Sequence, residues 1–155
     1  MGNQREELAG QIKALLHPIL EEQAVELVDL RIGGDSRRFH IEIFVDRPSG
    51  GITVGECSAI NRMLRNSMEA ENLISADYIM EVSSPGMDWP LVTEKDFIRV
   101  LTRPVKIILR EPIGEKMELG GTVLSVAAGV VVRKDESGEV SISLLQIQKA
   151  SQLID

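Results

Sequence analysis

The chain has 155 residues, of which 43% are hydrophobic and 26% are charged, and its formal net charge is −7 at pH 7. That composition is typical of a soluble globular protein, and no apolar run approaches the roughly 20 residues that cross a bilayer. The single cysteine, Cys57, excludes an internal disulfide and indicates a reducing compartment. The polar, acidic N-terminus argues against a secretory or transit signal, so we expect the protein in the cytoplasm.

The negative charge is concentrated in the first part of the chain. Residues 1–92 hold 8 Lys/Arg against 15 Asp/Glu, whereas residues 93–155 hold 9 of each. A protein that binds nucleic acid mainly through phosphate contacts should carry a basic face, and neither part is basic overall. The acidic part is better suited to a basic protein partner.

The first elements are a helix and two strands. Apolar residues at helical spacing predict a helix through Leu8 and Leu20, in which Pro18 should cause a kink or a split. Two alternating segments, residues 24–32 and 38–46, then predict a hairpin across the Gly33-Gly34-Asp35-Ser36 turn.

Each hairpin strand has an apolar and a polar side. We expect these side chains to face inward: Val28, Leu30, Ile32, Phe39, Ile41, Ile43 and Val45. The polar side carries Asp29, Arg31, Arg38, His40, Glu42 and Asp46. Phe44 lies among these polar residues, where it either contacts a partner or packs at the sheet edge.

A second helix and a third strand complete the first part. Thr53 and Glu56 predict a capping box for the helix. Its apolar face is expected to hold Val54, Cys57, Ile60, Leu64 and Met68. The strand begins at Tyr78 and alternates through Ser83. The order helix, strand, strand, helix, strand predicts an α+β fold, a sandwich of two helices on a three-stranded sheet over residues 1–91.

Residues 83–91 connect two differently patterned parts of the chain. Pro85 presets φ for a turn, Gly86 can take a positive φ, and Pro90 forces Trp89 into an extended conformation. The connector is therefore expected to be rigid. A direct role in binding and a purely connecting role both remain open.

The second part, residues 92–155, is rich in short strands. Thr93 and Asp96 predict a cap for a short helix at residues 94–101. Five strands follow, at residues 105–110, 117–126, 130–134, 140–144 and 149–154. The Gly120-Gly121 pair allows a sharp bend in the second of them. The pattern predicts a small C-terminal β-barrel of the Sm or SH3 type.

Several segments resemble the RimP family of bacterial ribosome maturation factors. The most specific is Glu81-Val82-Ser83-Ser84-Pro85-Gly86, followed by Asp88 and Pro90-Leu91. Weaker matches occur in the right order at residues 25–30, 43–46, 51–57, 103–107 and 120–124. At the position of Trp89 the family usually has arginine, so this chain offers a stacking surface in place of a guanidinium.

The resemblance covers essentially the whole chain and implies a non-enzymatic assembly factor. Such a factor binds the immature small ribosomal subunit and is linked to late folding of its rRNA. It is also linked to incorporation of ribosomal protein twelve, which is basic. We expect no cofactor and a monomer. The alternatives are an Sm-like RNA-binding chaperone module, and a small hydrolase using Cys57 or a carboxylate pair, for which no convergent triad is present.

The candidate partner-binding residues fall into three groups. On or near the polar side of the sheet are Glu26, Asp29, Glu42, Phe44 and Asp46. In the connector are Ser83, Ser84, Pro85, Gly86, Asp88 and Trp89. In the second part are Lys106, Arg110, Arg133 and Lys134. Cys57 is expected to be a buried structural residue. No zinc site is expected, because the two histidines, His17 and His40, have no further nitrogen or thiolate ligand at hand.

Overall fold

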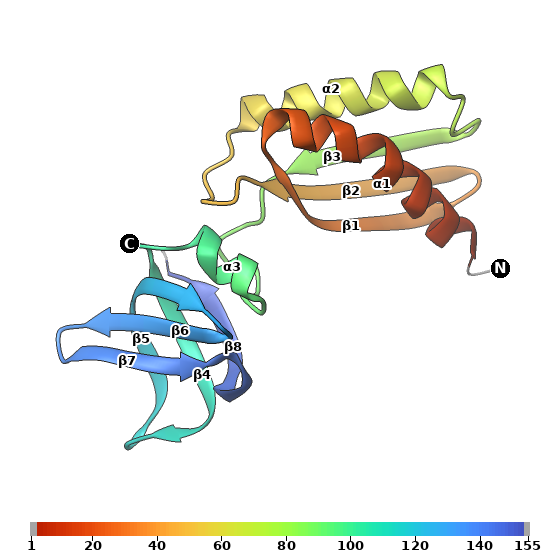
Figure 1. Cartoon of the computed structure of the whole chain (residues 1–155). Coiled ribbons are helices and arrows are strands. Elements are labelled where there is room, and N and C mark those ends of the chain that lie inside the picture. The colour runs from red at the N-terminus through yellow and green to blue at the C-terminus, as the bar shows by residue number, and fades with distance from the viewer. Residues whose placement is uncertain (1–2, 154–155) are drawn as a thin grey trace. The chain divides into compact units, whose positions relative to one another are not determined.

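The computed structural model describes residues 3–153, which form two compact units (Figure 1). The first unit runs to Arg47 and then from Gly51 to Pro85, and the second contains Pro48–Gly50 and continues from Gly86. The division between these compact units falls after Pro85, and the domain boundary expected at residues 91–92 stays a prediction. Whether each unit folds by itself, as a separate domain, stays a prediction.

The first unit is an α+β sandwich. Its elements are α1 (Asn3–Gln23), β1 (Glu26–Asp35), β2 (Arg38–Asp46), α2 (Val54–Ala70) and β3 (Asp77–Ser83). The strand order is β1-β2-β3, with β1 antiparallel and β3 parallel to β2. Both helices cover the same face of this sheet (Figure 1), which confirms the expected arrangement. Helix α2 connects β2 to β3, because two parallel strands need a long crossover connection and cannot be joined by a tight turn.

The core of the first unit lies between the helices and the sheet. Strand β2 is central, and its alternation is regular, so its inward side chains are fully covered. The most deeply buried residues of this core are Ile12, Leu16, Ile41, Ile43, Val45, Ile60 and Leu64. Burial of side chains of this size stabilises the unit by about 1.5–3 kcal/mol each.

Strand β1 departs from the expected alternation at one residue. The register shifts between Leu27 and Asp29, so Val28 is an extra residue in a β-bulge. Before the bulge the inward position is Leu27, which lies opposite Val45 and packs against the core. The expectation that Val28 faces inward was wrong, because a bulge shifts the alternation by one residue.

The two helices also differ in detail from the expectation. Helix α1 is one continuous helix with Pro18 inside it, not two pieces. Leu16 and Leu20 on either side of the proline are buried in the core, which offsets the lost backbone hydrogen bond. The capping box at the start of α2 is confirmed. Val54 is 84% exposed, so it does not belong to the apolar face of α2.

The second unit is built on an antiparallel sheet. Its elements are α3 (Glu94–Arg99), β4 (Pro104–Ile113), β5 (Lys116–Ala127), β6 (Val130–Asp135), β7 (Gly138–Ser143), the 3-10 helix η1 (Leu144–Gln146) and β8 (Ile147–Gln152). The strand order is β7-β6-β5-β4-β8. Its fully buried residues are Phe97, Ile107, Leu109, Val123, Val131 and Ile142. The last strand was expected to reach residue 154, which lies outside the described residues.

The sheet of the second unit bends sharply but is not closed by strand pairing. Within residues 3–153, the end strands β7 and β8 pair only with β6 and β4. Gly121 has a φ of 139°, and a Cβ there would lie 2.5 Å from the Lys134 carbonyl oxygen, so the bend requires glycine. The class of fold is therefore α+β, and the Sm-like barrel stays a prediction.

The end of the connector belongs to the second unit. Leu91 is buried in the second core, and its backbone N–H donates to the Ala150 carbonyl at 2.9 Å. The Asp96 carboxylate accepts from the backbone N–H of Val92 at 2.9 Å and of Thr93 at 3.0 Å, and it pairs with buried Arg99. The expected cap at Thr93 is thus confirmed, and Asp96 also fixes the chain before the helix.

Candidate partner-binding surface

The two helices of the first unit leave the other face of its sheet uncovered by helix (Figure 1). We call this the helix-free face. Strand alternation and register place outward side chains on it, among them Glu26, Asp29, Arg31, Arg38, His40, Glu42, Phe44, Asp77, Ile79 and Glu81. Four of the five candidate residues that were expected on or near the polar side of the sheet lie on this face, and Asp46 is the exception.

Arg31 and Phe44 are in contact on this face. The Arg31 guanidinium carbon lies 5.1 Å from the centroid of the Phe44 ring, which is a cation–π contact. The Arg31 Nε lies 3.0 Å from Asp29 Oδ2. The register explains the cluster, because Asp29 is opposite Phe44 and Arg31 is opposite Glu42.

Carboxylates outnumber cations on the helix-free face. Glu42 lies opposite Glu81 on the parallel strand, and the His40 Nε2 lies 4.0 Å from a Glu81 carboxylate oxygen. Ile79, next to them, is 38% exposed. A surface of carboxylates around an aromatic and an aliphatic side chain suits a cationic partner with some apolar character.

Asp46 does not belong to this surface. Its side chain was expected to face outward, but the residue is only 9% exposed. One carboxylate oxygen accepts from the backbone N–H of Arg47 at 2.9 Å and of Ile52 at 3.1 Å. Asp46 therefore ends β2 and fixes the start of the following loop, a role that requires its burial.

The connector presents small polar side chains. Ser83, Ser84, Gly86 and Asp88 are exposed, whereas Pro85 and Trp89 are half-buried. Ser83 ends β3 opposite Phe44, which places the start of the connector beside the helix-free face. The backbone N–H of Trp89 donates to the Gly86 carbonyl at 3.0 Å and closes a turn.

Gly86 does not adopt the positive φ that glycine permits. A Cβ at Gly86 would lie 2.8 Å from the Asp88 Oδ1 atom. That atom is the end of an exposed side chain that can rotate away. The connector turn therefore does not depend on glycine for its backbone conformation.

Two of the four candidate basic residues of the second unit, Arg133 and Lys106, are engaged in local pairs. Arg133 is 3% exposed, donates to the Gly120 carbonyl at 3.2 Å and pairs with Asp135, so it is a structural residue and not a surface contact. The Ser137 hydroxyl and N–H, and then Arg133, lower the pKa of Asp135 to about 2. Lys106 pairs with Glu118 at 3.3 Å. Arg110 and Lys134 are exposed.

Cys57 is buried in the first core, as expected. Burial, and then the nearby Asp46 carboxylate, raise the pKa of its thiol, which keeps it in the less reactive neutral form. His17 pairs with Glu21 on the exposed side of α1. Across residues 3–153, no group of three or more His, Cys, Asp and Glu side chains gathers to hold a metal. In the same residues, no helix is both long and apolar enough to cross a membrane.

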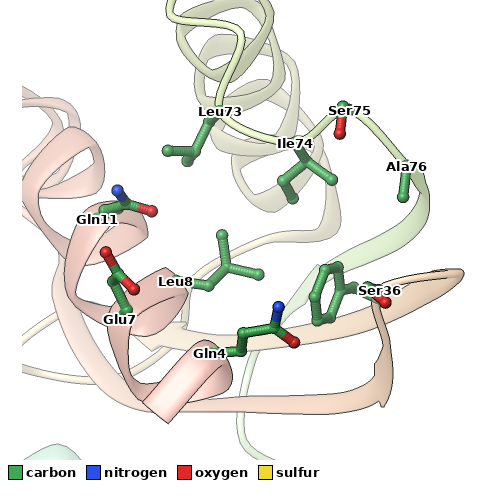
Figure 2. A pocket seen from close by; sticks show the side chains of 10 residues that line it. Gln4, Glu7, Leu8, Gln11, Ser36, Leu73, Ile74, Ser75 and Ala76 are labelled. Carbon is green, nitrogen blue, oxygen red and sulfur yellow. The ribbon is translucent and has the colours of Figure 1, made fainter. Parts of the chain in front are cut away.

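A shallow hollow of about 220 Å³ lies at one end of the first unit (Figure 2). The start of α1, the β1–β2 turn and the segment after α2 line it with Gln4, Glu7, Leu8, Gln11, Ser36, Phe39, Leu73, Ile74, Ser75 and Ala76. Only Leu8 and Phe39 of these are buried, and both are apolar. The hollow could not be predicted from the sequence, because its three walls are far apart along the chain.

Residues 15–88 match the model of the RimP N-terminal domain. The match includes the C-terminal part of α1, the whole helix-free face and the connector as far as Asp88. The RimP family consists of ribosome maturation factors. Residues 15–88 of this chain therefore belong to the RimP N-terminal domain family.

Proposed function

We propose that the protein is a non-enzymatic assembly factor of the small ribosomal subunit in the cytoplasm. Its helix-free face binds a basic protein of the immature subunit, which by family resemblance is ribosomal protein twelve. The observation that carries this proposal is the set of outward carboxylates on all three strands around Phe44 and Ile79. The protein acts as a monomer and uses no cofactor.

The proposed mechanism is conformational. A factor that binds one arrangement of the subunit more tightly than its competitors shifts the population toward that arrangement. Opposite charges on factor and partner speed their encounter and make binding sensitive to salt. The exposed start of the connector at Ser83 and Ser84 lies next to Phe44 in the sheet register and extends the same surface.

The second unit contributes auxiliary contacts through Arg110 and Lys134, which are exposed on β4 and β6. These two cations also support the second candidate function, an Sm-like RNA-binding module. The two candidates differ in salt dependence. Binding to naked RNA through phosphates should weaken steeply as salt rises, whereas an assembly factor should prefer the subunit to naked RNA at every salt concentration.

A pair of charge reversals tests the proposed function. Glu42→Lys with Glu81→Lys converts two neighbouring carboxylates of the helix-free face into cations. Glu22→Lys with Glu69→Lys makes the same charge change at exposed positions of α1 and α2. We expect only the first variant to lose co-sedimentation with free small subunits and binding to the isolated basic protein. Equal binding by both variants would contradict the proposal.

A further inference from the structure

The cluster around Arg31 resembles an occupied binding site. The guanidinium lies over the Phe44 ring, and its Nε lies 3.0 Å from Asp29. Glu42, the cross-strand neighbour of Arg31, is a second carboxylate beside it. An aromatic ring flanked by carboxylates is an arrangement that binds a planar cation, and here the chain supplies that cation itself.

The contacts of Arg31 with Phe44 and Asp29 are weak. The Arg31 side chain is 55% exposed and that of Asp29 is 43% exposed. Ion pairs and cation–π contacts between exposed groups contribute little, because water and salt compete with both. The Arg31 side chain can also leave the ring by rotating about its own bonds, without any change in the backbone.

We propose that Phe44, Asp29 and Glu42 form a guanidinium subsite that Arg31 fills in the unbound protein and that an arginine of the basic partner takes over on binding. This inference rests on the proposed function, because it names how the helix-free face recognises its partner. Arg31 then acts as an internal competitor. Single cations bind too weakly to displace it, whereas a segment with several basic residues gains enough from the surrounding carboxylates.

The subsite should prefer arginine to lysine. A guanidinium is planar, is weakly hydrated and can stack on Phe44 while it donates to a carboxylate in the same plane. The lysine ammonium is compact and strongly hydrated, so it loses more on leaving water. Removal of Arg31 should therefore strengthen binding of an arginine segment more than binding of a lysine segment.

The test uses the full-length chain and two synthetic peptides, one of alternating arginine and glycine and one of alternating lysine and glycine. Arg31→Gln removes the internal guanidinium. Arg38→Gln is the matched control, because Arg38 is exposed on the outward side of β2 and its loss changes the net charge equally. By titration calorimetry at low salt, we expect Arg31→Gln to tighten arginine-peptide binding about three- to tenfold more than Arg38→Gln does.

Two further results are expected from the same titrations. Arg31→Gln and Arg38→Gln should tighten binding of the lysine peptide equally, since only the net charge of the chain affects that binding. Adding Phe44→Leu to Arg31→Gln should remove the extra gain for the arginine peptide. Equal gains from the two arginine substitutions, equal gains for both peptides, or weaker binding after Arg31→Gln would each overturn the subsite.

The subsite and the proposed function fail in distinguishable ways. The proposed function is contradicted when the chain with Glu42→Lys and Glu81→Lys still travels with small subunits. The subsite is judged from the ratio of two affinities for one peptide, which does not depend on the subunit. Loss of subunit binding by that charge-reversed chain, together with equal behaviour of Arg31→Gln and Arg38→Gln, would overturn the subsite alone.

Discussion

The two units of this protein use their charged residues differently. In the second unit, three cations are paired locally, Arg133 with Asp135, Lys106 with Glu118 and Arg99 with Asp96. In the first unit, carboxylates of all three strands point outward on the helix-free face, where cations are fewer. Charges that are paired locally can stabilise a fold, whereas an excess of one sign on one face is available to a partner of the opposite sign.

The largest effect is expected where charge is structural. Asp96→Ala leaves buried Arg99 without its partner and removes the acceptor of the Val92 and Thr93 N–H groups. Loss of one partner of a buried pair costs about 3–5 kcal/mol. Urea unfolding of the full chain should show this loss, whereas Glu81→Ala on the helix-free face should change stability by less than about 0.5 kcal/mol. Similar losses of stability in Asp96→Ala and Glu81→Ala would contradict the comparison between the two units.

A pair of fragments tests whether the second unit is an independent domain. Residues 86–155 should unfold cooperatively, because they retain Leu91 and its hydrogen bond to Ala150. Residues 92–155 lack both and should be less stable by about 2–4 kcal/mol. Circular dichroism during thermal unfolding measures the difference. Absence of a cooperative transition in the fragment of residues 86–155 would show that the second unit needs the rest of the chain to fold.

Cys57→Ala should have an intermediate effect. The thiol is buried on α2, so its removal should lower stability by about 1–3 kcal/mol and leave small-subunit association intact at permissive temperature. Chemical unfolding and co-sedimentation measure the two quantities. Unchanged stability with complete loss of function would instead support a reactive cysteine.

Gly86→Val should have the smallest effect on stability. The residue is exposed and its φ is not positive, so valine meets only the Asp88 carboxylate, which can move. We expect a change below about 1 kcal/mol in urea unfolding. Trp89→Arg, which places the family's usual residue in the connector, should likewise leave the fold intact. Loss of the fold in the Trp89→Arg variant would place Trp89 in a hydrophobic core.

Local patterns predicted most elements, and long-range contacts account for the errors. Alternation predicted β2 correctly, and short-range capping predicted the starts of α2 and α3, because these signals lie within a few residues. The bulge at Val28 was missed, because a register shift depends on the partner strand. Asp46 and Arg133 were placed on the surface because they are charged, but Asp46 accepts from the Ile52 N–H, and Arg133 donates to the Gly120 carbonyl and pairs with Asp135 on the same strand.

Amide exchange in the full-length chain, with and without free small subunits, tests the central claim most directly. Binding at the helix-free face predicts slower exchange in β1, β2 and β3 near Asp29, Glu42 and Glu81, and little change on the exposed sides of α1 and α2. Charge reversal at Glu42 and Glu81 should abolish that protection. Protection confined to the outer sides of the helices, or to the second unit, would contradict the account.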